Sequence, residues 1–128
     1  MIYEFPILID PDTQQADATK TTVKLAPGTI TLLGIEFPSG CAGLVAVAIY
    51  EKTVRLFPTN NEYPFRSDDQ YLVFNPNYEL TKSPHILTIR AWNEDVRYPH
   101  TPIVRFEIIE KGRTLVDRLV RLLMGGGV

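Results

Sequence analysis

The sequence predicts an all-β protein: an antiparallel two-sheet sandwich, jelly-roll-like, with about eight strands. Ten prolines and eight glycines divide the 128-residue chain into short segments. Most of these segments alternate apolar and polar side chains, which is the pattern of strands with one buried face. About eight short strands separated by turn residues are typical of a sandwich or jelly roll, and a closed barrel is the alternative.

The N-terminal third is predicted to contain three strands. Residues 3–9, "YEFPILI", alternate well, but Pro6 has no N–H to donate, so this strand is expected at a sheet edge or with a bend. Residues 10–20 are polar and are predicted to form the most mobile loop. After a short strand, "TTVKL", residues 29–37 form the next one, where Gly34 is expected to produce a bulge.

The remaining five strands are predicted between residues 44 and 109. Residues 44–51, "LVAVAIYE", have apolar side chains on both faces, which indicates a central strand covered on both sides. Loops are predicted over 58–69 and 75–84. The other strands are expected at 53–57, 70–74, 85–92 and 102–109.

Two regions are predicted: a β-sandwich domain over 1–110, and a short amphipathic helix with a glycine-rich tail over 111–128. The segment "RTLVDRLVRLLM" has helical periodicity. Three helical turns are too short to be stable alone in water, so the helix must dock on its own sandwich, on a neighbouring subunit or on a membrane surface. Its apolar side includes Leu115, Leu119, Leu122 and Leu123.

Composition narrows the classes of function. The net charge of −2 argues against a general nucleic-acid binder, although a local basic patch remains compatible with it. The only cysteine, Cys41, lies in an apolar segment and is expected to be a buried, inert thiol. The N-terminus does not resemble a targeting signal, and the apolar runs fall far short of the roughly 20 residues that span a bilayer. Synthesis in the cytoplasm and no membrane partner are therefore expected.

The stretch "AWNEDVRYPHTP", residues 91–102, raises the question of a metal or catalytic site. Asp95, His100 and His85 could converge if their loops meet, but no metal-ligand spacing supports this arrangement. Asn and Asp side chains stabilise turns by bonding the nearby backbone. The stretch is therefore interpreted as a turn between two strands, without a metal.

Other chemical motifs are missing from the sequence. It contains no nucleophile elbow, Walker loop or dinucleotide fingerprint. Asp68 and Asp69 lack the alternating acids of a calcium loop and are interpreted as a solvated turn. A small hydrolase that uses Glu94, Asp95 or His100 is the least favoured reading, so no enzyme activity and no cofactor are expected.

Aromatic side chains in the predicted loops are the remaining candidates for recognition. They lie beside Asn, Asp and Arg, where they could stack on sugars, anchor a protein partner or fill the ends of the sandwich. These residues are Tyr63, Phe65, Tyr78 and Tyr98.

Three segments carry a resemblance to a known class of proteins: "IEFPSGCAGLVAVAIYE", "RLFPTNNEYPFRSDDQYLVF" and "LTIRAWNEDVRYPHTPIVRFEI". They resemble small β-sandwich virion structural proteins of tailed bacteriophages and related viruses, over about residues 28–109. The resemblance implies a head decoration, connector or tail-associated protein of the virion, made in the host cytoplasm. It implies no catalytic residues.

The sequence thus predicts a non-enzymatic structural protein that forms homo-oligomers or binds other virion proteins. A carbohydrate-binding module that uses the loop aromatics is the alternative, so a glycan partner stays open. Nucleic acid and metal are not expected partners. The candidate contact residues are Tyr63, Phe65, Arg66, Tyr98, His100, Leu115, Leu119, Leu122 and Leu123.

Overall fold

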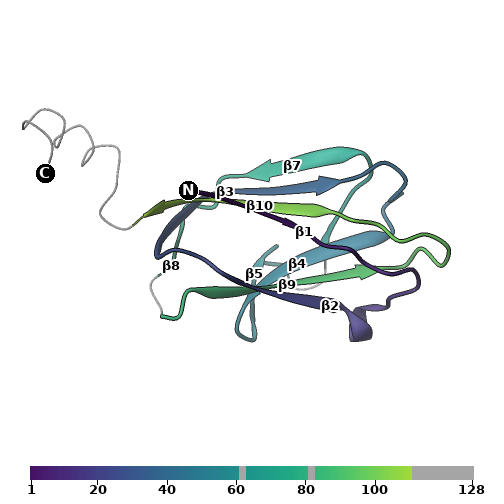
Figure 1. Cartoon of the computed structure of the whole chain (residues 1–128), viewed down its shortest axis with the longest axis horizontal. Helices are drawn as coiled ribbons and strands as arrows, with labels where there is room; N and C mark the ends of the chain where they lie inside the picture. Colours follow the sequence, from purple (N-terminus) through teal and green to yellow (C-terminus); the bar gives the residue numbers. More distant parts are fainter. Residues whose placement is uncertain (61–62, 81–82, 111–128) are drawn as a thin grey trace, which may run out of the picture.

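The computed structural model describes residues 1–60, 63–80 and 83–110, which form two antiparallel sheets stacked face to face (Figure 1). A short 3-10 helix, η1 (Gln15–Asp17), lies between the first two strands. The strands are β1 (Ile2–Pro6), β2 (Thr19–Lys24), β3 (Gly28–Phe37), β4 (Val45–Glu51), β5 (Val54–Phe57), β6 (Phe65–Arg66), β7 (Gln70–Phe74), β8 (Tyr78–Leu80), β9 (Ile86–Asn93) and β10 (Ile103–Glu110).

The first sheet has the order β1-β10-β3-β7, and β8 also pairs with β3. The second sheet has the order β2-β9-β4-β5, and β6 also pairs with β4. The chain passes from one sheet to the other at each step from β1 to β4, and again from β6 to β7, from β8 to β9 and from β9 to β10. The prediction of an all-β chain with two antiparallel sheets is confirmed.

The structure has ten strands in its described residues, not about eight, and the two additional strands lie in segments that the sequence predicted as loops. β5 and β6 pair with different parts of β4, and β7 and β8 pair with different parts of β3. Each of these outer positions is thus filled by two short strands. Pro58 and Pro64 lie between β5 and β6, and Pro76 lies between β7 and β8. Proline cannot donate to a ladder, so pairing is interrupted there.

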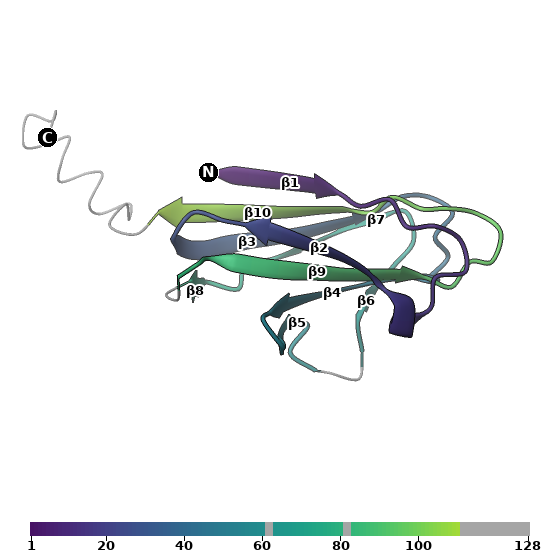
Figure 2. The ribbon, with the colours of Figure 1, turned by 60° about the horizontal axis from the view of Figure 1, so that its bottom comes forward.

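The predicted positions of two strands in their sheets are confirmed. β1 carries Pro6 and, among the described strands, pairs only with β10, at the edge of the first sheet (Figure 2). β4 lies between β9 and β5 inside the second sheet. Its residues 45–49 are fully buried on both faces.

The predicted bulge at Gly34 is wrong. Gly34 pairs in register with Arg105 and with Val73, and the ladder between β3 and β10 shifts at Thr31 instead. A Cβ at Gly34 would overlap the ring of Tyr71. Glycine is therefore required by the close approach of an aromatic ring on the outer face of the sheet.

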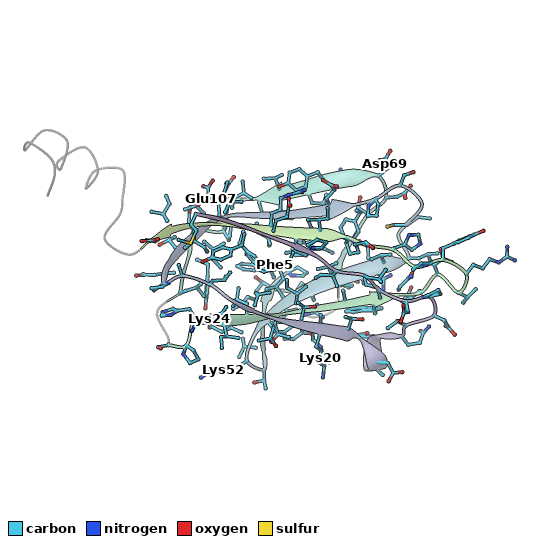
Figure 3. All side chains as sticks on the ribbon, viewed as in Figure 1. Phe5, Lys20, Lys24, Lys52, Asp69 and Glu107 are labelled. Atoms are coloured by element: carbon cyan, nitrogen blue, oxygen red, sulfur yellow. The ribbon has the colours of Figure 1, made fainter. Side chains whose placement is uncertain are left out.

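The core lies between the two sheets, where Figure 3 places Phe5. Phe5 packs edge-on against Phe106, with ring centroids 6.2 Å apart. Fully burying one such large apolar side chain stabilises a fold by about 1.5–3 kcal/mol. The largest fully buried side chains are Phe37, Phe106, Ile9, Ile30, Leu33, Ile35, Ile49, Leu87, Ile89, Ile108, Val45 and Val47.

The polar segment predicted as the most mobile loop is tied to the sandwich. Thr13 and Asn93 exchange two backbone hydrogen bonds, of 2.8 and 2.9 Å. The last two residues of this segment, Thr19 and Lys20, belong to β2 and pair with β9.

The predicted C-terminal helix over 111–128, with its candidate residues Leu115, Leu119, Leu122 and Leu123, lies outside the described residues. Within the part of the chain that is described, no helix is long and apolar enough to cross a bilayer.

Candidate binding loops at one end of the sandwich

Four connections between strands gather at one end of the sandwich, which we call the loop end (Figure 1). They are the β1–β2, β3–β4, β6–β7 and β9–β10 connections, over residues 7–18, 38–44, 67–69 and 94–102. Antiparallel pairing brings them together, because neighbouring strands run in opposite directions and alternate connections share an end. The stretch "AWNEDVRYPHTP" is the centre of this group.

Asn93 organises the β9–β10 connection from inside. It is fully buried at the end of β9. Its amide Nδ2 donates to the carbonyl oxygens of Tyr98 at 2.8 Å and Ile9 at 3.4 Å. Its Oδ1 accepts the backbone N–H of Asp95 at 3.0 Å. Both polar atoms of a buried amide are thus satisfied, and two connections are joined through one side chain.

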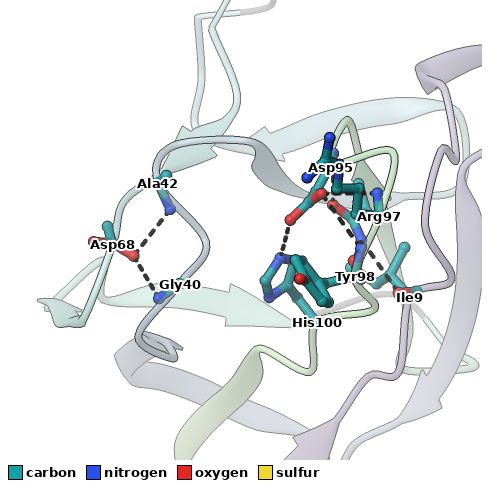
Figure 4. Close-up of polar contacts among 9 residues, drawn as sticks. Ile9, Gly40, Ala42, Asp68, Asp95, Arg97, Tyr98 and His100 are labelled. Atoms are coloured by element: carbon teal, nitrogen blue, oxygen red, sulfur yellow. Dashed lines mark hydrogen bonds and ion pairs between the residues drawn. The ribbon is translucent and has the colours of Figure 1, made fainter.

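Asp95 closes the tip of the same connection (Figure 4). One carboxylate oxygen accepts the backbone N–H groups of Arg97 at 2.9 Å and Tyr98 at 3.3 Å. The other oxygen lies 2.9 Å from Nε2 of His100. These bonds favour the ionised carboxylate, so the pKa of Asp95 is lowered, first by the Arg97 N–H and then by His100.

Three large apolar side chains are exposed in the β1–β2 and β9–β10 connections: Leu8, Val96 and Tyr98, which we call the loop patch. They are 63%, 68% and 63% exposed. Leu8 is fixed by its neighbour Ile9, whose backbone pairs with that of His100. Exposed apolar side chains on a fixed backbone are a feature of protein-binding surfaces.

Asp68 shapes a second turn of the loop end. Its Oδ1 accepts the backbone N–H groups of Gly40 at 3.0 Å and Ala42 at 2.9 Å (Figure 4). Between them lies Cys41, which is fully buried. Burial, and to a smaller extent the charges of Asp68 and Asp95, raise the pKa of this thiol to about 11. Cys41 therefore stays protonated at neutral pH, where a thiol is a poor nucleophile.

Besides His100, which contacts Asp95, two further candidate contact residues have internal partners. Arg66 makes two hydrogen bonds to Glu94, at 3.1 and 3.0 Å, and a third to the Gly43 carbonyl oxygen at 3.1 Å. Phe65 stacks on Phe74, with ring centroids 5.1 Å apart, and packs against the core. Both side chains hold β6 in place.

The other candidate aromatics divide into two groups. Tyr63 is 65% exposed and Tyr98 is exposed to a similar extent. Tyr78 instead packs edge-on against Phe57 and donates to Glu51 at 2.9 Å. This places Tyr78 at the wall of the core, and Tyr63 and Tyr98 in solvent.

The three residues that could have formed a metal site do not converge. Asp95 and His100 are in contact, but His85 precedes β9 whereas Asp95 follows it. An eight-residue strand separates its two ends by roughly 25 Å. Among residues 1–60, 63–80 and 83–110, no three His, Cys, Asp or Glu side chains are placed to hold a metal ion.

Comparison with protein-family models, with curated proteins and with solved structures gave no match for this chain. Leu8 and Val96 were missed in the sequence, although an apolar residue at the tip of a polar turn, as in "NEDVRY", is the signal that could have found Val96.

Proposed function

We propose that this protein is a non-enzymatic structural protein, a jelly-roll sandwich that assembles with copies of itself and with other proteins of a virion. The proposal rests on the loop patch, on the order of the strands and on the resemblance of residues 28–109 to virion proteins. Each of these supports a different part of it.

The strand order supports the jelly-roll assignment. We count β5 and β6 as one strand, and β7 and β8 as another, and number the eight resulting strands along the chain. The spatial order is then 1-8-3-6 in the first sheet and 2-7-4-5 in the second. Early and late strands then alternate within each sheet, as in two nested Greek keys. Jelly rolls recur in viral capsid proteins and in lectins. At this level the functional inference is an analogy of fold, and the loop patch must carry the rest.

The observation that carries the proposal is the display of Val96 and Tyr98 on a loop already fixed by Asn93 and Asp95. Ordering a flexible loop costs free energy when a partner binds, and a loop braced by its own hydrogen bonds avoids most of that cost. Tyrosine is enriched among the residues that dominate binding energy at protein interfaces. The loop patch is therefore suited to a protein contact.

Light scattering coupled to size-exclusion chromatography tests the proposal. The wild-type chain is expected to form a discrete oligomer as its concentration rises. Val96→Ser is expected to weaken this association about tenfold, since burying a valine contributes about 1.5 kcal/mol. Val54→Ser is the matched control: Val54 is 62% exposed on β5, away from the loop end.

A wild-type chain that stays monomeric at every concentration would overturn self-assembly. Equal weakening by both valine substitutions would overturn the assignment to the loop patch.

The second candidate is a carbohydrate-binding module, favoured by the exposure of the Tyr63 and Tyr98 rings. Aromatic faces with polar neighbours stack on sugars. A glycan array tests it: binding that is lost in both Tyr63→Ala and Tyr98→Ala would support this function, and an array without signal would contradict it.

A further inference from the structure

The outer face of the second sheet carries a concentration of positive charge. Strand alternation turns Lys20 and Lys24 of β2 and Arg90 of β9 away from the core, and Lys52 lies in the adjoining β4–β5 turn. Figure 3 shows Lys20, Lys24 and Lys52 on the side of the second sheet, whereas Glu107 and Asp69 lie on the side of the first. The chain as a whole is nevertheless acidic, with a net charge of −2.

Two of these cations lie directly opposite each other. Lys20 and Arg90 are cross-strand partners in the register of β2 and β9. Like charges in such a pair destabilise a sheet. None of the ion pairs among the described residues involves either side chain. On the first sheet, by contrast, Arg105 is paired with both Glu4 and Glu36.

Tyr50 fixes the guanidinium of Arg90 in this arrangement. The Arg90 guanidinium lies 5.2 Å from the centre of the Tyr50 ring, and the Arg55 guanidinium lies 5.5 Å from it. Arg55 Nε also donates to the Tyr50 hydroxyl at 3.2 Å, and Nη1 donates to the Asn60 carbonyl oxygen at 3.2 Å. Two guanidinium groups are thus held against one ring, which adds to the local positive potential.

A recess of about 310 Å³ opens at this place. The groups that line it are ammonium, guanidinium and hydroxyl groups, without a carboxylate. Ammonium and guanidinium groups act only as hydrogen-bond donors, and hydroxyl groups can donate. The lining residues are Lys20, Tyr50, Lys52, Thr53, Thr88 and Arg90.

We propose that this recess binds a tetrahedral oxyanion, a phosphate or sulfate group. Arg90 and Lys20 supply charge-assisted hydrogen bonds from two neighbouring strands, Lys52 closes the site from the β4–β5 turn, and the hydroxyls of Thr53 and Thr88 complete the donors. The oxyanion offsets the repulsion between Lys20 and Arg90. A repulsion of this kind, with no carboxylate among the lining residues to offset it, is typical of a functional site.

This site is independent of the loop patch. The recess lies on the outer face of the second sheet, over β2, β9 and the β4–β5 turn, whereas the loop patch lies in connections 7–18 and 94–102. Loss of oxyanion binding would therefore leave the proposed assembly unaffected, and loss of assembly would leave oxyanion binding unaffected.

Calorimetric titration of the full chain with inorganic pyrophosphate and with inorganic sulfate, at constant ionic strength, tests the proposal. We expect binding that weakens roughly tenfold or more in Lys20→Gln and in Arg90→Gln, because each removes a charged hydrogen bond. Lys24→Gln is the matched control: it removes the same charge from the same face of β2 but does not line the recess. It should bind as the wild type does.

Thermal unfolding without ligand supplies a second readout. Lys20→Gln is expected to raise Tm because it relieves the repulsion with Arg90, although it weakens binding. Equal binding by Lys20→Gln and Lys24→Gln, or no binding of either ion by the wild type, would overturn the proposal. Titration with glucose 6-phosphate and with a sulfated oligosaccharide then shows whether the recess prefers phosphate or sulfate. The ligand that binds more tightly carries the preferred group.

Discussion

The side-chain amide of Asn93 donates to the carbonyl oxygen of Tyr98 at 2.8 Å and so closes the β9–β10 connection on itself. A buried side chain at the end of a strand thereby sets the position of an exposed aromatic ring five residues later. This contact links the buried end of β9 to Tyr98 of the loop patch. The stability of the loop and its capacity to bind should consequently change together.

Asn93→Ala should lower the free energy of unfolding by about 1–3 kcal/mol, because buried backbone groups lose their partners. Asn75→Ala is the control, since the exposed Asn75 also donates to a backbone carbonyl, that of Thr31, at 2.9 Å. Its cost should stay below about 1 kcal/mol, because water replaces an exposed partner. Urea unfolding of both variants makes the comparison. Equal costs would contradict the bracing role of Asn93.

Asp95 should make stability depend on pH in the acid range. Its pKa is lowered in the folded protein by the Arg97 N–H and by His100. The unfolded chain therefore binds a proton at a higher pH than the folded one, and the stabilisation is complete above the ordinary carboxyl pKa of about 4. This stabilisation is lost as the pH falls through the lowered pKa that Asp95 has in the folded protein.

Asp95→Asn keeps an acceptor oxygen but removes the charge. It should be less stable than the wild type at about pH 7, and the difference should shrink below about pH 4. Urea unfolding midpoints measured across this range would show it. A difference that does not change with pH would mean that the charge of Asp95 contributes nothing.

The fold could be predicted from the sequence because alternation is a local signal. Apolar side chains at every second position predicted the strands β9 and β10. Apolar side chains on both faces of residues 45–49 predicted the central position of β4. The short strands β6 and β8 were missed because two or three residues between prolines carry too little periodicity. Their pairing is set by β4 and β3, which are distant in sequence.

The candidate sites were less predictable because they depend on register. The Asn and Asp residues of "AWNEDVRYPHTP" were enough to predict a turn. The carbonyl oxygens of Ile9 and Tyr98, to which Asn93 donates, come within its reach only after folding. The opposition of Lys20 and Arg90 is likewise invisible until β2 and β9 are aligned. A shift of β2 by one residue against β9 would turn Lys20 to the other face, away from Arg90.

Cys41 should be unreactive in the native protein. Its thiol is fully buried and its pKa is raised to about 11 by burial and by the charges of Asp68 and Asp95. A disulfide reagent at about pH 8 should label it only after urea unfolds the chain, since only the thiolate reacts. Ser39→Cys places a thiol two residues away at an exposed position and should react at once. Equal labelling of both thiols in the native protein would contradict the burial of Cys41.

The effect of Gly34→Ala on stability should change sign when Tyr71 is replaced, which a double-mutant cycle can measure. In the wild type, a methyl group at Gly34 must displace the Tyr71 ring, over which the Arg105 guanidinium lies at 5.1 Å. Gly34→Ala should therefore lower stability by about 1–2 kcal/mol, through loss of ring contact and of the cation–π contact.

In the Tyr71→Ser background the ring that a methyl group at Gly34 would overlap is gone, so the same Gly34→Ala change should raise stability by about 0.5–1 kcal/mol, which is the usual gain of alanine over glycine in a strand. Urea unfolding of the four proteins of the cycle measures the coupling. If Gly34→Ala costs the same with and without the ring, the glycine is required by the backbone of β3 and not by Tyr71. A coupling of the expected sign would establish that the Tyr71 ring, on the outer face, occupies the space that a side chain at position 34 would need.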